Sequence, residues 1–215
     1  MRQSIISVAF GLSMLSLSAA HAQGAQGYVG GGLGWANIGV DCTDVAACDK
    51  SGTGGKLYGG YRFANQFALE GVYINWGKAK GRITDDLVVP VGLAVPLDGS
   101  PIPVTADVDL KAAGLGIGMA YFMPVAKDWT GVVRLGVISN KGRLKLTASS
   151  NGSTVSESDS KRAAFADLGF GVGYNLSPNL ALTGEADFSR VKYGSEGEHE
   201  TDNVRLISLG LRYSF

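Results

Sequence analysis

Charged side chains recur at alternate positions of strand-like segments, and they are the strongest candidates for chemistry in this sequence. Arg134 and Gly136 alternate with Val133, Leu135 and Val137. Because successive side chains of a strand point to opposite faces, this segment would have one apolar face and one that is charged or bare. The same alternation places seven charged residues opposite large apolar neighbours. They are Arg62, Glu70, Arg134, Asp167, Glu185, Asp187 and Arg212.

Evidence for catalysis or metal binding is weak by comparison. Beyond the N-terminal segment the chain has a single histidine, His199, between Glu198 and Glu200. With Ser195 or Asp202 it could act as a general base, and with the flanking carboxylates it could bind a metal. One histidine in an exposed acidic loop is more often neither. We therefore expect no catalytic residue, no cofactor and no metal site.

Eight segments show the period-two alternation that indicates β strands. They span about 26–38, 56–64, 67–80, 109–123, 129–146, 161–176, 179–193 and 203–215. Short turns join the second to the third, the fourth to the fifth and the sixth to the seventh. Longer and more polar loops join the others.

The first 22 residues differ from everything that follows. Arg2 precedes an apolar run, and Ala20-His21-Ala22 is a small-x-small cleavage site. This pattern is typical of a secretory signal peptide, which leaves residues 23–215 as the mature domain. In that domain charges, glycines or prolines interrupt every apolar run before the roughly 20 residues that a transmembrane helix needs.

A closed β-barrel is the remaining structure with which such a chain could cross a membrane. Short turns on one side and long loops on the other indicate an outer-membrane barrel whose short side faces the periplasm. The sequence therefore predicts an all-β fold, an eight-stranded antiparallel up-and-down transmembrane barrel. Its formal net charge of zero gives no electrostatic case for nucleic acid.

The interior of this barrel would hold the charged face of the strands. Its four acids and three bases nearly balance, and Lys56 could complete the balance. Buried charges must pair, so they would form either an ionic gate across a narrow pore or a salt-bridged plug. The plug is favoured because eight strands enclose little more space than side chains fill. Glycines on some strands would leave room for charged side chains from others.

Four stretches together resemble the transmembrane domain of outer membrane protein A-like proteins. They are 67–73 (FALEGVY), 169–174 (GFGVGY), 177–179 (SPN) and 209–215 (LGLRYSF), and the resemblance covers nearly all of the mature chain. It implies an eight-stranded barrel with a charged, largely plugged interior, surrounded by outer-membrane lipid and lipopolysaccharide.

The end of the chain resembles the signal by which the barrel-assembly machinery recognises its substrates. The residues that carry this resemblance are Leu209, Leu211, Tyr213 and Phe215. It implies that this machinery and periplasmic chaperones are partners during biogenesis.

Two features belong to the expected external loops. Cys42 and Cys48 form an even pair in an exported chain, which favours a disulfide that closes a small surface ring. The segment 81–108 is apolar yet contains four of the six prolines, which argue against a central strand. It could cap the barrel mouth, lie against the outer leaflet or bind a surface ligand.

The sequence thus predicts a non-enzymatic outer-membrane barrel that serves envelope integrity and surface interaction through four extracellular loops. The alternative is a narrow porin-like channel for ions or small solutes, or a channel for hydrophobic ligands of the outer membrane protein W type. The two differ in the size of the lumen, which the sequence leaves open.

Overall fold

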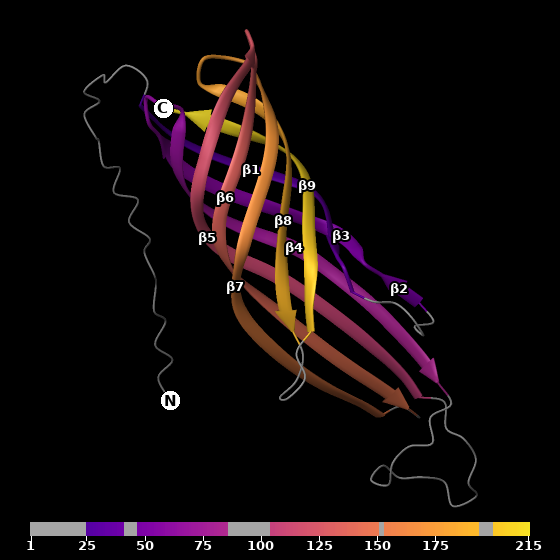
Figure 1. Cartoon of the computed structure of the whole chain (residues 1–215). Coiled ribbons are helices and arrows are strands. Elements are labelled where there is room, and N and C mark those ends of the chain that lie inside the picture. The colour runs from indigo at the N-terminus through magenta and orange to yellow at the C-terminus, as the bar shows by residue number, and fades with distance from the viewer. Residues whose placement is uncertain (1–24, 41–46, 86–103, 151–152, 194–199) are drawn as a thin grey trace, which may run out of the picture.

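The computed structural model describes residues 25–40, 47–85, 104–150, 153–193 and 200–215, and these residues form nine β strands (Figure 1). The strands are β1 (Gln26–Ile38), β2 (Ala47–Asp49), β3 (Ser51–Arg62), β4 (Phe67–Asp85), β5 (Val104–Ala126), β6 (Trp129–Ser150), β7 (Ser153–Asn175), β8 (Leu180–Tyr193) and β9 (Glu200–Ser214). In these described ranges, no helix is long and apolar enough to cross a membrane.

Eight of the described strands close into a ring. Each pairs antiparallel with its neighbours in the order β1, β3, β4, β5, β6, β7, β8, β9, and β9 pairs with β1. The ninth, β2, has three residues and pairs with the far end of β4. The predicted all-β antiparallel fold is confirmed, and β2 is an addition that the sequence pattern did not reveal.

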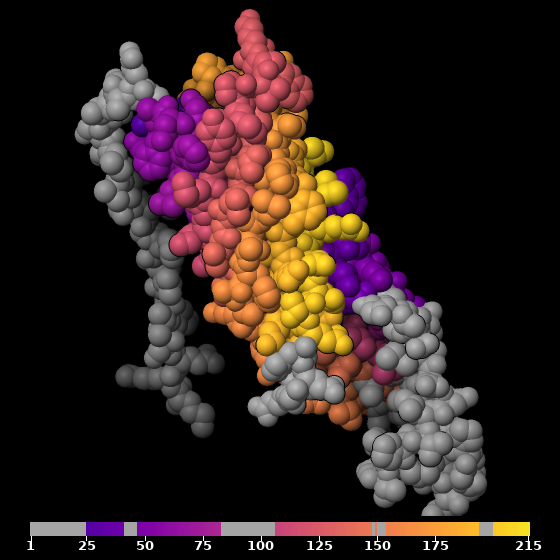
Figure 2. All heavy atoms as spheres, in the orientation of Figure 1, coloured from indigo at the N-terminus to yellow at the C-terminus, as the bar shows by residue number. Residues whose placement is uncertain are grey.

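The two faces of the ring have opposite chemistry. Leu33, Trp35, Leu115, Ile117 and Leu209 point outward and are between 65% and 75% exposed. Charged side chains of the same strands point inward and are buried. Exposed apolar and buried charged side chains are the arrangement of a barrel surrounded by lipid. Figure 2 shows the elongated body that these outward side chains cover.

Strands β4, β5, β6 and β7 shorten two of the long loops that the sequence pattern predicts. β4 continues to Asp85 and β5 begins at Val104, so the expected loop 81–108 is strand at both ends. β6 and β7 stay paired as far as Ser150 and Ser153, where a polar loop was expected. The prediction of long loops at these two places was therefore wrong in extent. Backbone pairing defines these strand ends, and their side chains lack the apolar alternation that lipid contact imposes.

The lengthened strands form a sheet that extends beyond the other strands, at the lower right of Figure 1. Pairing between β7 and β8 stops at Leu168 and Phe188, so the remainder of β7 pairs with β6 alone. We call the part of this extension beyond the lumen the outer sheet; it comprises residues 80–85, 104–109, 143–150 and 153–160.

A bulge in β4 changes which residues face outward. Asn75 and Lys78 pair with residues of β5 only two positions apart, so Trp76 and Gly77 together oppose one residue. Gly77 has a φ of 76°, a left-handed conformation that glycine adopts without steric cost. Before the bulge the odd-numbered side chains point outward, whereas beyond it Lys78 is exposed and Ala79 is buried. The sequence analysis did not reveal this reversal of the two faces.

Several predictions fall outside the described residues. They concern the signal peptide (1–22), Cys42, the central part of the second loop (86–103) and His199. Cys48 lies on β2 and is exposed. The disulfide between Cys42 and Cys48 stays a prediction.

Candidate functional site

Five charged side chains from four strands meet inside the barrel. Arg134 of β6 donates from Nε to Oε2 of Glu70 on β4 at 2.8 Å and from Nη2 to Oε1 of Glu185 on β8 at 3.2 Å. Lys56 of β3 donates from Nζ to Oδ2 of Asp187 at 2.8 Å and forms an ion pair with Glu185. All five residues are buried. This middle tier of the lumen is a continuous hydrogen-bonded network.

Two tyrosines complete the network. The Tyr28 hydroxyl donates to Oε1 of Glu70 at 2.6 Å, and the Tyr58 hydroxyl donates to Oε1 of Glu185 at 3.0 Å. The guanidinium of Arg134 lies 4.7 Å from the centroid of the Tyr58 ring. Sequence analysis did not assign either tyrosine to the site. Both occupy inward positions of their strands, and that parity is the signal that could have found them.

Asp167 of β7 lies beside this network but is not part of it. It is 6% exposed, and its Oδ1 has no hydrogen-bond partner among the described residues. Nη1 of Arg134 is also without a partner there. Because Asp167 lies at the same level of the lumen, we count it in the middle tier, which then holds four carboxylates and only two basic groups.

Glycines make the room that these side chains occupy. A Cβ at Gly169 would lie 2.8 Å from Oδ1 of Asp187 and 3.2 Å from Cβ of Arg134. A Cβ at Gly30 would lie 2.4 Å from Cζ of Tyr58. Such distances are closer than van der Waals contact allows. Only a glycine at each of these positions leaves enough space for the large side chain from the other strand.

The remaining predicted charges, Arg62 and Arg212, lie apart from this network. Both guanidinium groups pack on the ring of Phe122, at 5.4 and 4.9 Å from its centroid. Arg62 donates to Oε1 of Gln26 at 2.7 Å. The structure thus separates the charged residues predicted for one lumen network into two groups.

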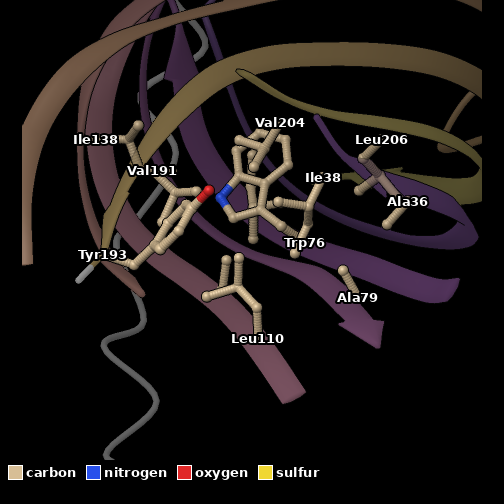
Figure 3. Close-up of a cluster of buried hydrophobic side chains, with 12 residues drawn as sticks. Ala36, Ile38, Trp76, Ala79, Leu110, Ile138, Val191, Tyr193, Val204 and Leu206 are labelled. Carbon is tan, nitrogen blue, oxygen red and sulfur yellow. The ribbon is translucent and has the colours of Figure 1, made fainter. Parts of the chain in front are cut away.

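An apolar cluster fills the lumen on the other side of the middle tier (Figure 3). Trp76 is fully buried, and its Nε1 donates to Oδ1 of Asn140 at 2.9 Å. Asn140 donates in turn to Oγ of Ser189 at 3.1 Å and to the Arg190 carbonyl at 2.6 Å. The other members of this outer tier are Ala36, Ile38, Ile74, Ala79, Leu110, Ala112, Ile138, Val191, Tyr193, Val204 and Leu206.

The outer tier was missed because the sequence analysis expected a polar interior throughout. Ile74 has the same parity as Glu70 on β4, and Leu206 has the same parity as Arg212 on β9. Extending the inward positions along each strand would have located both. The lumen therefore contains the apolar outer tier, the ionic middle tier and a third region around Arg62 and Arg212.

The predicted assembly-signal residues lie on the outward face of β9 and directly after its end. Leu209, Leu211, Tyr213 and Phe215 are between 49% and 70% exposed. Within the described ranges, no group of three or more His, Cys, Asp or Glu residues is arranged to hold a metal ion.

A closed antiparallel ring with an apolar exterior and a charged interior defines an outer-membrane β-barrel. Residues 7–215 match the family described as outer membrane protein beta-barrel domain. The chain belongs to this family, and the protein resides in the outer membrane, which it crosses with its strands. No curated protein sequence matches the chain.

Solved structures share this fold. Neisserial surface protein A is 16% identical, with a TM-score of 0.56 over 90% of this chain and 100% of that one. Ail, the attachment invasion locus protein of Yersinia pestis, is 19% identical, with a TM-score of 0.52 over 89% of this chain and 99% of that one. At such identities the likeness establishes the fold.

Proposed function

We propose that the protein is a non-enzymatic, sealed barrel that serves envelope integrity by holding lipopolysaccharide around its outer rim. The observation that carries this proposal is a set of basic side chains, one on each of six consecutive strands, just beyond the lipid-facing apolar surface. We call this set the basic collar. Its members are Lys78, Lys111, Lys141, Arg162, Arg190 and Arg205.

Each collar residue is the first charged side chain beyond the last exposed large apolar residue on the outward face of its strand. Lys111 follows Leu115 on β5, and Arg205 follows Ile207 on β9. On β4 the bulge is what turns Lys78 outward. A basic residue at the same place on six strands supports contact with one anionic layer.

The phosphate groups of lipopolysaccharide supply such a layer in the outer leaflet. Lys and Arg form charge-assisted hydrogen bonds with phosphate oxygens. Near an anionic membrane surface each contributes about 1 kcal/mol. Higher on the outer sheet, Arg82 donates to Asp107 at 2.7 Å, and this exposed hydrogen bond raises the pKa of Arg82. The collar cations have no such ion pair with any described residue, which leaves them available to phosphate.

The lumen supports a sealed rather than a conducting barrel. The cavity that touches Glu70, Arg134, Asp167 and Asp187 has a volume of about 10 Å³. That volume holds at most about one water molecule. The apolar outer tier lies on one side of it, so neither hydrated ions nor solutes have an open route. The channel alternative requires both tiers to move.

Titration of the barrel in detergent micelles with lipopolysaccharide tests the collar. The double variant Lys111→Gln/Lys141→Gln should bind about tenfold or more weakly, because two charges of about 1 kcal/mol each are lost. Lys127→Gln, which removes an exposed lysine from a short turn at the opposite end, is the matched control and should bind as the wild type does.

Dephosphorylated lipid A is the matched ligand control. It should lose most of the affinity, and the collar variant should no longer differ from the wild type. Equal binding of phosphorylated and dephosphorylated ligand, or an equal loss in Lys127→Gln, would show that the collar does not recognise phosphate.

A further inference from the structure

A cavity of about 420 Å³ opens at the short-turn end of the barrel. Its lining includes Arg62 of β3, Arg212 of β9 and Asp128 in the turn between β5 and β6. We call it the vestibule. We propose that the vestibule binds a small oxyanion, a phosphate or a carboxylate, between its two guanidinium groups. This inference does not depend on the collar or on lipopolysaccharide.

Arg212 is the first observation behind this proposal. It is 5% exposed, and it forms no hydrogen bond or ion pair with any residue in the described part of the chain. Its guanidinium packs on the Phe122 ring, and Nη2 lies 3.4 Å from the position of a Cβ at Gly173. A buried cation requires a partner, and the cavity beside Arg212 is where a partner can lie.

Arg62 provides the second cation of the same site. Both guanidinium groups lie within 5.4 Å of the centroid of the Phe122 ring, although like charges repel. Gln26 accepts a hydrogen bond from Nη2 of Arg62, which fixes the side chain without neutralising it. Two arginines held against one ring present their N–H groups to a shared space, and planar guanidinium groups match the oxygens of phosphate and carboxylate.

The charge distribution along the lumen supports an anion at this place. The middle tier has four carboxylates for Lys56 and Arg134, whereas the vestibule has two arginines for Asp128. The four acids and four bases that point into the lumen balance in number but are separated along the barrel. A concave surface with a net positive charge concentrates anions, so the vestibule attracts an anion from the periplasm.

The separation of acids from bases along the lumen also makes the vestibule a closed end rather than the entrance to a pore. The carboxylates of the middle tier repel an anion bound at Arg212 and so oppose its passage further into the lumen. Its further partners are polar side chains of the lining, among them Thr130 and Asn175. The cavity volume is within the range of about 300–1,000 Å³ that is usual for small-molecule sites.

Calorimetric titration of the folded barrel in detergent with inorganic phosphate, and separately with succinate, tests the proposal. Arg212→Gln and Arg62→Gln should each weaken binding about ten- to a hundredfold, the range expected for losing hydrogen bonds to a charged group. Arg212→Lys keeps a point charge without the planar fork and should bind between the wild type and Arg212→Gln. Arg143→Gln, an exposed arginine of the outer sheet, should leave binding unchanged.

Heat-modifiable migration on a detergent gel identifies the variants that fold. If Arg212→Gln does not fold, Arg62→Gln and Arg212→Lys still test the site. The proposal is overturned if neither probe binds the wild type. It is also overturned if Arg143→Gln weakens binding as much as Arg62→Gln does, because binding would then lie on the exterior.

Discussion

The membrane-embedded barrel and the outer sheet are built from the same strands but differ in what their two faces contact. In the barrel one face contacts lipid and the other a lumen packed with side chains, so large exposed apolar residues recur at alternate positions of each strand. In the outer sheet both faces lie beyond the lipid, and Lys145 and Ser158 pair on one of them. Apolar side chains at alternate positions therefore mark a strand only where two different environments impose them.

Disrupting the ionic network of the middle tier should have the largest effect on the stability of the membrane-embedded barrel. Arg134→Met leaves Glu70 and Glu185 without their shared partner, and an uncompensated buried charge costs about 3–5 kcal/mol. We expect the free energy of unfolding in urea to fall by that amount. Arg143→Met, at an exposed position of β6, is the matched control and should stay within about 0.5 kcal/mol of the wild type. Equal stability of the two variants would show that the ionic network does not stabilise the barrel.

The bulge in β4 lies between the membrane-embedded barrel and the outer sheet. A substitution there should lower the free energy of unfolding by a smaller amount. Gly77→Ala forces a residue with a Cβ into a left-handed conformation, at a cost of about 1–2 kcal/mol. Gly71→Ala is the control on the same strand, because a Cβ at Gly71 meets no atom within 4 Å. Urea unfolding should separate the two variants. A Gly77→Ala protein as stable as Gly71→Ala would mean that the left-handed conformation is not required.

The smallest effect is expected in the first external loop, where we propose a disulfide between Cys42 and Cys48. A ring this small restricts little chain entropy, so the bridge contributes about 2 kcal/mol or less, and to its own loop. The reduced protein should keep its heat-modifiable migration on a detergent gel. Loss of that shift on reduction would mean that the loop clamps the barrel, and the separation of rigid barrel from external segments would be wrong.

The sequence predicted the barrel wall better than its contents. Lipid contact leaves a visible pattern, as in Leu209 to Phe215, so strand existence and the outward faces could be read directly. The pairing of Glu70 with Arg134 rather than with Arg212 depends on how strands around the ring bring inward side chains together. The alternation of residues within one segment does not reveal which inward side chains from different strands meet.

Two other features depended on local geometry. One additional residue at Trp76 and Gly77 reversed the faces of everything after it in β4, and a glycine in a glycine-rich chain does not by itself mark a bulge. The ends of β6 (147–150) and β7 (153–160) are rich in Ser and contain few large apolar residues, so composition indicated a loop where backbone pairing continues. In both places the structure depends on backbone hydrogen bonds that have no side-chain signature.

We propose that this barrel acts through its outer surface while its lumen is closed. Single-channel recording in planar bilayers tests it most directly. We expect no discrete conductance steps from the wild-type protein, and none from Arg134→Met, because the apolar outer tier still closes the lumen of that variant. Regular openings of the wild type at moderate voltage would contradict it, because ions would then cross both the apolar tier around Trp76 and the network of Lys56, Glu70, Arg134 and Glu185.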